Sequence, residues 1–433
     1  MGQRRRTVET LAGIARDDNE MTGLITVCRA CGGRLAATMA DLGLQPPSNA
    51  FLPSLSDARH EKRYPLRAKV CGTCKLVQVD YDVAPEELFG NYVYFSSYSD
   101  EWLAHAKRYA EMARERFGLG ADSLVVELAS NDGYLLKNFV DRGIPVLGID
   151  PSDTVARAAE KIGVPTLVEF FGESLAGTLI AQGRGADLII GNNVLAHVPR
   201  LNDFVAGIAT LLKPTGTVTI EFPHLLKLIE HVEFDTIYHE HFSYLSLYAI
   251  ERVFAGHGLR IYEAEELATH GGSLRIFAAH ASRDGLADGS RLQALRAREA
   301  AAGLADLATY ERFAERVEVC RKSLLDFLAR AKREGKTVAG YGAAAKGNTL
   351  LNFCNVSAGD IPMVADRNPH KQSKFLPGTH IPVVTPEELM RARPDYVLIL
   401  PWNLQGEIRR QLAGIAEWGG RFVIPVPVAT IDP

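Results

Sequence analysis

The sequence predicts an α/β protein in three parts: a small cysteine-rich module, a central doubly wound domain and a smaller α/β domain at the C-terminus. Three observations support this prediction. Two C-x-x-C pairs stand near the N-terminus, apolar strand segments alternate with helical ones from residue 123, and the same alternation restarts at residue 336. The length of 433 residues also exceeds what one hydrophobic core comfortably supports.

The composition narrows the functional classes. Hydrophobic residues make up 47% and charged residues 23%, and the net charge is -4. This balance gives no electrostatic reason to expect a nucleic acid or an anionic membrane surface as partner. No apolar run reaches the roughly 18 residues of a membrane span. Free thiols in pairs are typical of a reducing compartment, so we expect a cytoplasmic protein, as a monomer or weak homodimer.

Changes in composition divide the chain into five segments. Residues 1–20 are charged and lack the apolar core of a signal peptide, so we expect a disordered extension. Residues 21–85 form the cysteine-rich module and residues 86–282 the central domain. Residues 283–335 have helical spacing and are expected to connect the two α/β domains, and residues 336–433 form the second one.

The first chemical signal is the set of four cysteines Cys28, Cys31, Cys71 and Cys74. A C-x-x-C pair places two thiolates on one tight turn, and two such turns close a tetrahedral zinc site. Four thiolates fill the coordination shell, so the predicted Zn²⁺ is structural. The 39 residues between the pairs predict an inserted hairpin or loop. A redox pair and unconnected core cysteines are the alternatives.

The central domain is predicted from alternating strands and helices. A helix is expected from Asp100 to Phe117 and another from Gly133 to Arg142. Strands are expected at Ser123–Leu128, Pro145–Ile149, Ala186–Gly191 and Gly216–Glu221.

A cofactor site is predicted where these strands end, because ligands of open α/β sheets bind at the carboxyl ends of strands. The first turn contains Gly133 alone, so the G-x-G-x-x-G dinucleotide fingerprint is absent. An acidic first turn disfavours pyrophosphate but tolerates cationic S-adenosylmethionine (SAM), and Asp150 can accept hydrogen bonds from ribose hydroxyls. Capping carboxylates on solvated turns are the alternative. The predicted cofactor residues are Glu127, Ala129, Asn131, Asp132, Gly133, Asp150, Asn192 and Asn193.

Six motifs together carry a family resemblance. They are the two cysteine pairs and the segments 127–136, 191–199, 238–244, 270–275 and 340–348. In this order the chain resembles the three-part sugar C-methyltransferases that act on nucleotide-linked 4-keto-deoxysugars. The resemblance implies an N-terminal zinc module, a central Rossmann-like SAM-binding domain and a Rossmann-like C-terminal domain that helps to hold the nucleotide sugar.

Methylation at carbon beside a ketone requires a base, a donor to the enolate oxygen and a methyl sulfonium held in line. Tyr238, Glu240 and His241 lie within four residues, and the resemblance places them in the active site. We expect His241 to be the base, Tyr238 the enolate donor and Glu240 an orienting group. The alternative is that these side chains serve packing and capping.

The substrate is expected to be a nucleoside-diphosphate-linked 4-keto-deoxysugar, preferably a dTDP-sugar, methylated at C3 or else at C5. Tyr92, Tyr94 and Ser97 belong to an aromatic and hydroxyl segment that either closes over the ligands or packs on the zinc module. For His197 packing on a helix is the preferred alternative, and a plain loop competes for His270 and Arg275. The predicted substrate residues are Tyr92, Tyr94, Ser97, His197, His224, His270, Arg275, Tyr341, Lys346 and Asn348.

The glycine-rich segment 340–348 follows an expected strand and leads into a helix. Glycines let backbone N–H groups approach oxyanions, and a helix start adds partial positive charge. Its spacing differs from a Walker A loop, so we expect the pyrophosphate of the nucleotide sugar near Lys346. A nucleotide fold that has lost its ligand is the alternative.

Two other functions compete with this prediction. An NAD-dependent sugar dehydrogenase or epimerase requires a glycine-rich first turn and usually a Tyr-x-x-x-Lys pair, and the sequence has neither at the expected places. A zinc-ribbon adaptor for nucleic acid requires a basic face, which the net charge of -4 does not favour.

Overall fold

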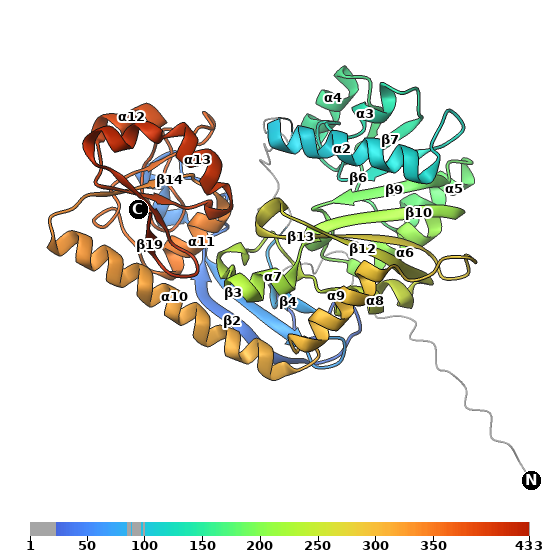
Figure 1. The fold of residues 1–433 in the computed structure, drawn as a ribbon, viewed down its shortest axis with the longest axis horizontal. Coiled ribbons are helices and arrows are strands. Elements are labelled where there is room, and N and C mark those ends of the chain that lie inside the picture. The colour runs from blue at the N-terminus through green and yellow to red at the C-terminus, as the bar shows by residue number, and fades with distance from the viewer. Residues whose placement is uncertain (1–22, 85–87, 89–96, 98–99, 433) are drawn as a thin grey trace, which may run out of the picture.

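The computed structural model describes residues 23–84, 88, 97 and 100–432. Within these residues the strands form sheets of two, four, six and seven strands. The two larger sheets belong to separate α/β units, and the four-stranded sheet lies between and below them in the view of Figure 1. Tyr92 and Tyr94 lie outside the described residues.

The cysteine-rich module is built on a long antiparallel hairpin. Its elements are β1 (Gly23–Leu24), β2 (Leu35–Gln45), η1 (Leu55–His60), β3 (Tyr64–Cys71), β4 (Val77–Val79) and β5 (Tyr81–Asp82). The pair β2 and β3 is the hairpin expected between the two cysteine pairs. The fourth strand of its sheet is β11 (Ser243–Tyr244), which pairs with β4 and comes from the central unit.

The central unit carries the seven-stranded sheet, in the order β12-β13-β10-β9-β6-β7-β8. Its strands are β6 (Val125–Leu128), β7 (Val146–Ile149), β8 (Thr166–Leu167), β9 (Ala186–Asn192), β10 (Leu212–Pro223), β12 (Leu259–Leu267) and β13 (Ser273–His280). Its helices are α2 (Asp100–Phe117), α3 (Lys137–Val140), α4 (Asp153–Lys161), α5 (Glu173–Ala181), η3 (Leu195–His197), α6 (Leu201–Leu211), α7 (Leu225–His231), η4 (Phe234–Thr236), α8 (Leu247–Gly256) and η5 (Thr269–Gly271). Only β13 is antiparallel to its neighbours.

Both faces of this sheet are buried, as a doubly wound sheet requires. Val125 of β6 packs against residues of α2 and α3, whereas Val126 packs against residues of α5, α6 and α8. Successive side chains of a strand point to opposite faces, so a continuous apolar run serves both layers. The predicted doubly wound fold is confirmed.

One predicted helix is wrong in its extent. The helix expected over Gly133–Arg142 is regular only in α3, Lys137–Val140. The residues before it form a turn in which Ala129, Asn131 and Gly133 have φ of 57°, 49° and 76°. Left-handed backbone cannot continue a right-handed helix, so the turn delays the helix start.

The C-terminal unit follows two connecting helices, α9 (Ser290–Ala301) and α10 (Leu307–Arg333). Its sheet has the order β16-β15-β14-β17-β18-β19, parallel except for β19. The strands are β14 (Val338–Tyr341), β15 (Val364–Ala365), β16 (Val383–Val384), β17 (Tyr396–Ile399), β18 (Arg421–Ile424) and β19 (Thr430–Ile431). The helices are α11 (Ala345–Phe353), α12 (Pro386–Ala392), η6 (Trp402–Leu404), α13 (Gln405–Gln411) and η7 (Ala413–Trp418).

Packing joins the three parts. One core cluster contains side chains from β2 and β3, from the α7–η4 region, from α10 and from the C-terminal sheet. Helix α10 runs along the cysteine-rich module and the C-terminal unit in Figure 1. Within the described part of the chain, no helix combines the length and apolarity that crossing a membrane requires.

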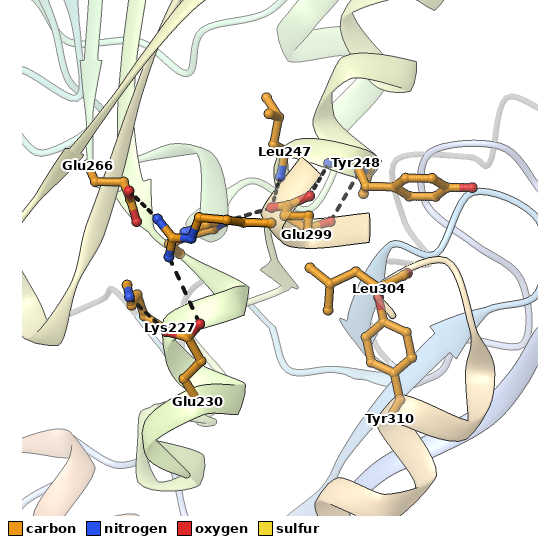
Figure 2. Close-up of polar contacts among 12 residues, drawn as sticks. Lys227, Glu230, Leu247, Tyr248, Glu266, Glu299, Leu304 and Tyr310 are labelled. Carbon is orange, nitrogen blue, oxygen red and sulfur yellow. Dashed lines mark hydrogen bonds and ion pairs between the residues drawn. The ribbon is translucent and has the colours of Figure 1, made fainter. Parts of the chain in front are cut away.

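Glu299 at the end of α9 ties the connector to the central unit. Its carboxylate is buried and accepts hydrogen bonds from the backbone N–H groups of Leu247 and Tyr248, at 2.8 and 2.7 Å, in the first turn of α8 (Figure 2). It also bonds to His224 Nε2 at 2.7 Å. A carboxylate at a helix N-terminus satisfies N–H groups that otherwise lack partners.

Candidate functional site

The four N-terminal cysteines form a metal-binding cluster. Their Sγ atoms all lie within 4.8 Å of one another. The Cys28–Cys74 and Cys31–Cys71 Sγ distances are 3.5 and 3.4 Å. A disulfide requires about 2.05 Å, whereas sulfurs at 2.3 Å from a tetrahedral zinc are about 3.8 Å apart. The geometry therefore fits one Zn²⁺ with four thiolates, and these residues would hold it as a closed structural site.

The local backbone explains why these turns bring the sulfurs together. The amide of Gly32 donates to the Cys28 carbonyl, and the amide of Thr73 points to Cys71 Sγ at 3.4 Å. A Cβ at Gly33 would lie 2.9 Å from Thr73 Oγ1 and 3.2 Å from Cys31 Sγ. Glycine at this position permits the close approach of the two turns.

The predicted cofactor residues converge where β6, β7 and β9 end. The first turn, after β6, wraps around the Asp150 carboxylate at the end of β7. Asp150 accepts hydrogen bonds from the backbone N–H groups of Asn131 and Ser152, at 3.0 and 2.9 Å. Asn192 is buried at the end of β9, and Asn193 follows with φ of 53°. These residues lie on adjacent strands of one sheet edge.

Several buried polar atoms of this site lack a hydrogen-bond partner within the described residues. They are Glu127 Oε2, Asp132 Oδ1 and Asn193 Oδ1. Burial, and then the neighbouring Asp150 and Asp132 carboxylates, raise the pKa of Glu127 well above its ordinary value. Buried polar atoms normally have partners, so the site matches a ligand that offers donors such as ribose hydroxyls and an amino group.

The segment before α2 reaches this site. The backbone N–H of Ser97 donates to Asp132 Oδ2 at 3.2 Å. Gly133, the only glycine of the first turn, has φ of 76°, and a Cβ there would lie 3.1 Å from Ala159 and from Val164. The first turn therefore requires glycine at this position for both backbone and packing reasons.

The predicted catalytic residues lie together after η4. Tyr238 Oη and His241 Nε2 are 2.8 Å apart, and His241 Nδ1 is 2.9 Å from the carbonyl oxygen of Thr236. A carbonyl only accepts, so Nδ1 carries the proton and Nε2 is left as an acceptor for the Tyr238 hydroxyl. A neutral imidazole held in this tautomer has its basic nitrogen directed at the tyrosine.

His197 packs beside this pair, with its ring centroid 4.7 Å from that of His241. Burial lowers the pKa of His197 to about 4. His197 therefore stays neutral near pH 7 and adds no positive charge beside the proposed base.

Glu240 is 4% exposed, and its Oε1 accepts a hydrogen bond of 2.7 Å from Asn49 Nδ2. Burial raises the pKa of Glu240 to about 7, while the Asn49 hydrogen bond and the Lys371 charge act in the opposite direction. A carboxyl with such a pKa is partly ionised near neutral pH.

Two predicted substrate residues are engaged in buried networks of the central unit. Arg275 pairs with Glu221 at 2.6 Å, and Glu221 also contacts His105 at 2.9 Å. His224 is bonded to Glu299, as described above. The backbone of His270 belongs to the η5 turn. These positions stay predictions for substrate binding.

The C-terminal residues mostly face the other parts of the chain. Lys346 Nζ is 2.8 Å from Asn403 Oδ1 and 4.2 Å from the Trp402 ring centroid. Asn348 Nδ2 donates to the Ser48 carbonyl of the cysteine-rich module at 2.6 Å. Tyr341 packs in the core beside α12 and α13, and its hydroxyl donates to Gln411. A phosphate contact of Lys346 stays a prediction.

A polar cluster beside Lys346 supports the catalytic segment. Trp402 Nε1 donates to Asp235 Oδ2 at 2.7 Å. Burial raises the pKa of Asp235 to about 6 and that of Glu233 to about 8, and the Lys346 charge opposes both shifts. The segment that carries Tyr238 and His241 is therefore anchored from the C-terminal unit.

Four residues of the site region escaped the sequence analysis: Asn49, Thr236, Glu299 and Lys371. Thr236 acts through its backbone carbonyl, which no side-chain pattern reveals. Asn49 and Glu299 act over separations of 191 and 75 residues in the chain. The Pro47–Ser48–Asn49 turn was the one available signal for Asn49, as a turn that had to be placed somewhere.

Comparison with known proteins places the three parts in one family. Residues 28–89 match a putative zinc binding domain, residues 102–264 a methyltransferase domain, and residues 268–427 the C-methyltransferase C-terminal domain. The chain is 36% identical to the C-methyltransferase NovU of Streptomyces niveus over 403 residues, which are 93% of this chain and 96% of that protein.

Two solved structures resemble part of the chain. Magnesium protoporphyrin IX methyltransferase of Synechocystis PCC 6803 is 16% identical, covers 41% of this chain and 83% of its own, and has a TM-score of 0.34. The PH0226 protein of Pyrococcus horikoshii OT3 is 16% identical, covers 46% of this chain and 100% of its own, and has a TM-score of 0.37. From the three domain matches in order and the full-length similarity to NovU, the chain belongs to the family of SAM-dependent C-methyltransferases that carry an N-terminal zinc-binding module.

Proposed function

We propose that this C-methyltransferase acts on a nucleoside-diphosphate-linked 4-keto-deoxysugar, with dTDP preferred, and methylates the carbon beside the ketone. C3 is the favoured carbon and C5 the alternative, because both flank a C4 ketone. The observation that carries the proposal is the Tyr238–His241 pair at 2.8 Å with Nδ1 held on the Thr236 carbonyl. This arrangement supplies a neutral base and an adjacent hydroxyl donor.

The residues divide the work as follows. The carbon-bound proton ends on His241 Nε2, directly or by way of the Tyr238 hydroxyl, because these atoms are in hydrogen-bond contact. A protonated Nε2 becomes a donor to Tyr238 Oη, which leaves the tyrosine proton available for the enolate oxygen. Bound SAM supplies the electrophilic methyl group. Glu240 stands next to His241 and is placed to orient a sugar group.

SAM is proposed to bind at the ends of β6, β7 and β9. Glu127 and Asp132 would offer their unpartnered oxygens to ribose or methionine donors, and Asp150 stands at the strand end where ribose is expected. Asp150 also shapes the first turn through two backbone hydrogen bonds. The site is therefore organised before the ligand arrives.

Replacing Asp150 by asparagine is expected to weaken SAM binding by about 1.5–3 kcal/mol, because a charged two-oxygen acceptor is lost. Asparagine keeps one acceptor oxygen for the turn. Isothermal titration calorimetry with SAM measures the change. Asp153→Asn, three residues later and exposed on α4, is the matched control and should bind as wild type does. Equal affinity of Asp150→Asn and wild type would move the site elsewhere.

The substrate is tested by product analysis. Purified protein is incubated with SAM and dTDP- or UDP-linked 4-keto-deoxysugars, and mass spectrometry looks for a gain of one methylene mass. NMR of the product then identifies the methylated carbon. A methylated dTDP-sugar supports the proposal, whereas turnover of a substrate without a ketone would contradict it.

A further inference from the structure

We infer that the zinc-binding module supplies a positioning residue to the active site: Asn49, whose side-chain amide holds the Glu240 carboxylate in place. The inference rests on the proposed function, because Asn49 acts on the reaction only through Glu240. It assigns the zinc-binding module a part in organising the active site in addition to its metal site.

The contact itself is short and crosses between two parts of the chain. Asn49 Nδ2 lies 2.7 Å from Glu240 Oε1, although 191 residues separate the two in sequence. Glu240 is buried, whereas Asn49 is exposed as a residue. Truncating Asn49 therefore removes a hydrogen bond to a buried carboxylate with little loss of buried apolar surface, which makes it a selective probe.

The loop that carries Asn49 is held at both ends by the C-terminal unit. Before it, the carbonyl of Ser48 accepts the Asn348 amide at 2.6 Å. After it, Leu52 and Phe375 exchange two backbone hydrogen bonds of 3.0 and 2.9 Å. A loop anchored in this way presents its donor without an ordering cost when substrate binds.

The charged and titratable groups around Glu240 come from three directions. Lys371 of the C-terminal unit is the nearby positive charge and favours the ionised carboxylate. His197 of η3 is kept neutral by burial. On the same segment, His239 is directed to the Pro65 carbonyl at 3.3 Å, and His241 is paired with Tyr238.

Asn49 and Lys371 thus both oppose the effect of burial on Glu240. Without the Asn49 donor, the pKa of Glu240 should rise above its value of about 7. A larger fraction of Glu240 is then protonated at neutral pH, and the remaining carboxylate has lost one of its two orienting partners. Activity that needs the ionised, oriented form falls for both reasons.

A double-mutant cycle tests this inference with the full-length enzyme. The variants are Asn49→Ala, Glu240→Gln and the double variant, each assayed for kcat over pH 5.5–9 with the dTDP-linked 4-keto-deoxysugar and SAM. Asn49→Ala should lower kcat about 5- to 30-fold at pH 7, as the loss of a hydrogen bond to a charged group implies. The acidic limb of its profile should move to higher pH. In the Glu240→Gln background, Asn49→Ala should have almost no further effect.

The outcomes separate the inference from the proposed function. If Glu240→Gln lowers kcat and Asn49→Ala lowers it by the same factor in both backgrounds, Asn49 does not act through Glu240 and the inference is overturned. A wild-type pH profile in Asn49→Ala overturns it as well. If Glu240→Gln itself leaves kcat unchanged, the proposed role of Glu240 fails and the inference fails with it. Thermal unfolding of Asn49→Ala close to wild type shows that the change is local.

Discussion

His241→Asn should lower turnover by about 10²–10⁴-fold, the usual effect of losing a general base. Asparagine places an amide N–H near the position of Nδ1, so the contact with the Thr236 carbonyl can persist while the basic Nε2 is gone. Steady-state kinetics should show the loss in kcat, and calorimetry should show SAM binding close to wild type.

Two variants accompany this measurement. His60→Asn, an exposed histidine on η1, should retain wild-type turnover. Tyr238→Phe should lose less activity than His241→Asn, because only a donor to the enolate oxygen is removed. A loss in Tyr238→Phe as large as in His241→Asn would show that the tyrosine relays the proton. Wild-type turnover of His241→Asn would pass the role of base to Glu240, His239, His224 or His270.

Loss of one metal-binding cysteine should destabilise the protein as a whole. The cysteine sulfurs Cys28, Cys71 and Cys74 belong to the same hydrophobic cluster as the central sheet, so the zinc-binding module is packed on the central unit. Structural zinc contributes folding free energy directly. We expect Cys71→Ser to lower the midpoint of thermal unfolding by about 10 °C or more. Metal analysis should give about one zinc per wild-type chain and less than one in the variant.

Cys320→Ser is the matched control, because Cys320 is equally buried but lies on α10 outside the metal cluster. It replaces a buried thiol by a hydroxyl without touching the metal, and it should retain full zinc content. Wild-type protein that is folded, active and free of zinc would contradict the structural role of the metal.

Local elements were predictable because their signals are local. The helix Asp100–Phe117 and the strand Val338–Tyr341 were predicted with the bounds the structure gives them. Both follow from runs of apolar residues with one period and a clear start. The helix after the first turn was wrong in extent, since left-handed backbone at Ala129 and Asn131 is not visible in residue types that usually avoid it.

The metal site and the catalytic trio were also accessible from sequence, since each is a compact motif. What the sequence did not reveal is how the parts touch. Asn49 contacts Glu240 and Asn348 contacts Ser48 across 191 and 300 residues. Such pairs depend on the docking of whole units, which spacing along one chain does not encode. Lys346 shows the same effect, because a loop expected at a phosphate also packs against Trp402.

The central claim is that the enzyme removes a proton beside the ketone before methyl transfer, with His241 as the base. Hydrogen exchange tests this step without the methyl donor. Wild-type enzyme in D₂O with the 4-keto sugar nucleotide and S-adenosylhomocysteine should place deuterium at the reacting carbon, as NMR and mass spectrometry detect. His241→Asn should exchange far more slowly under the same conditions. Wild-type rates of exchange in His241→Asn would contradict the account.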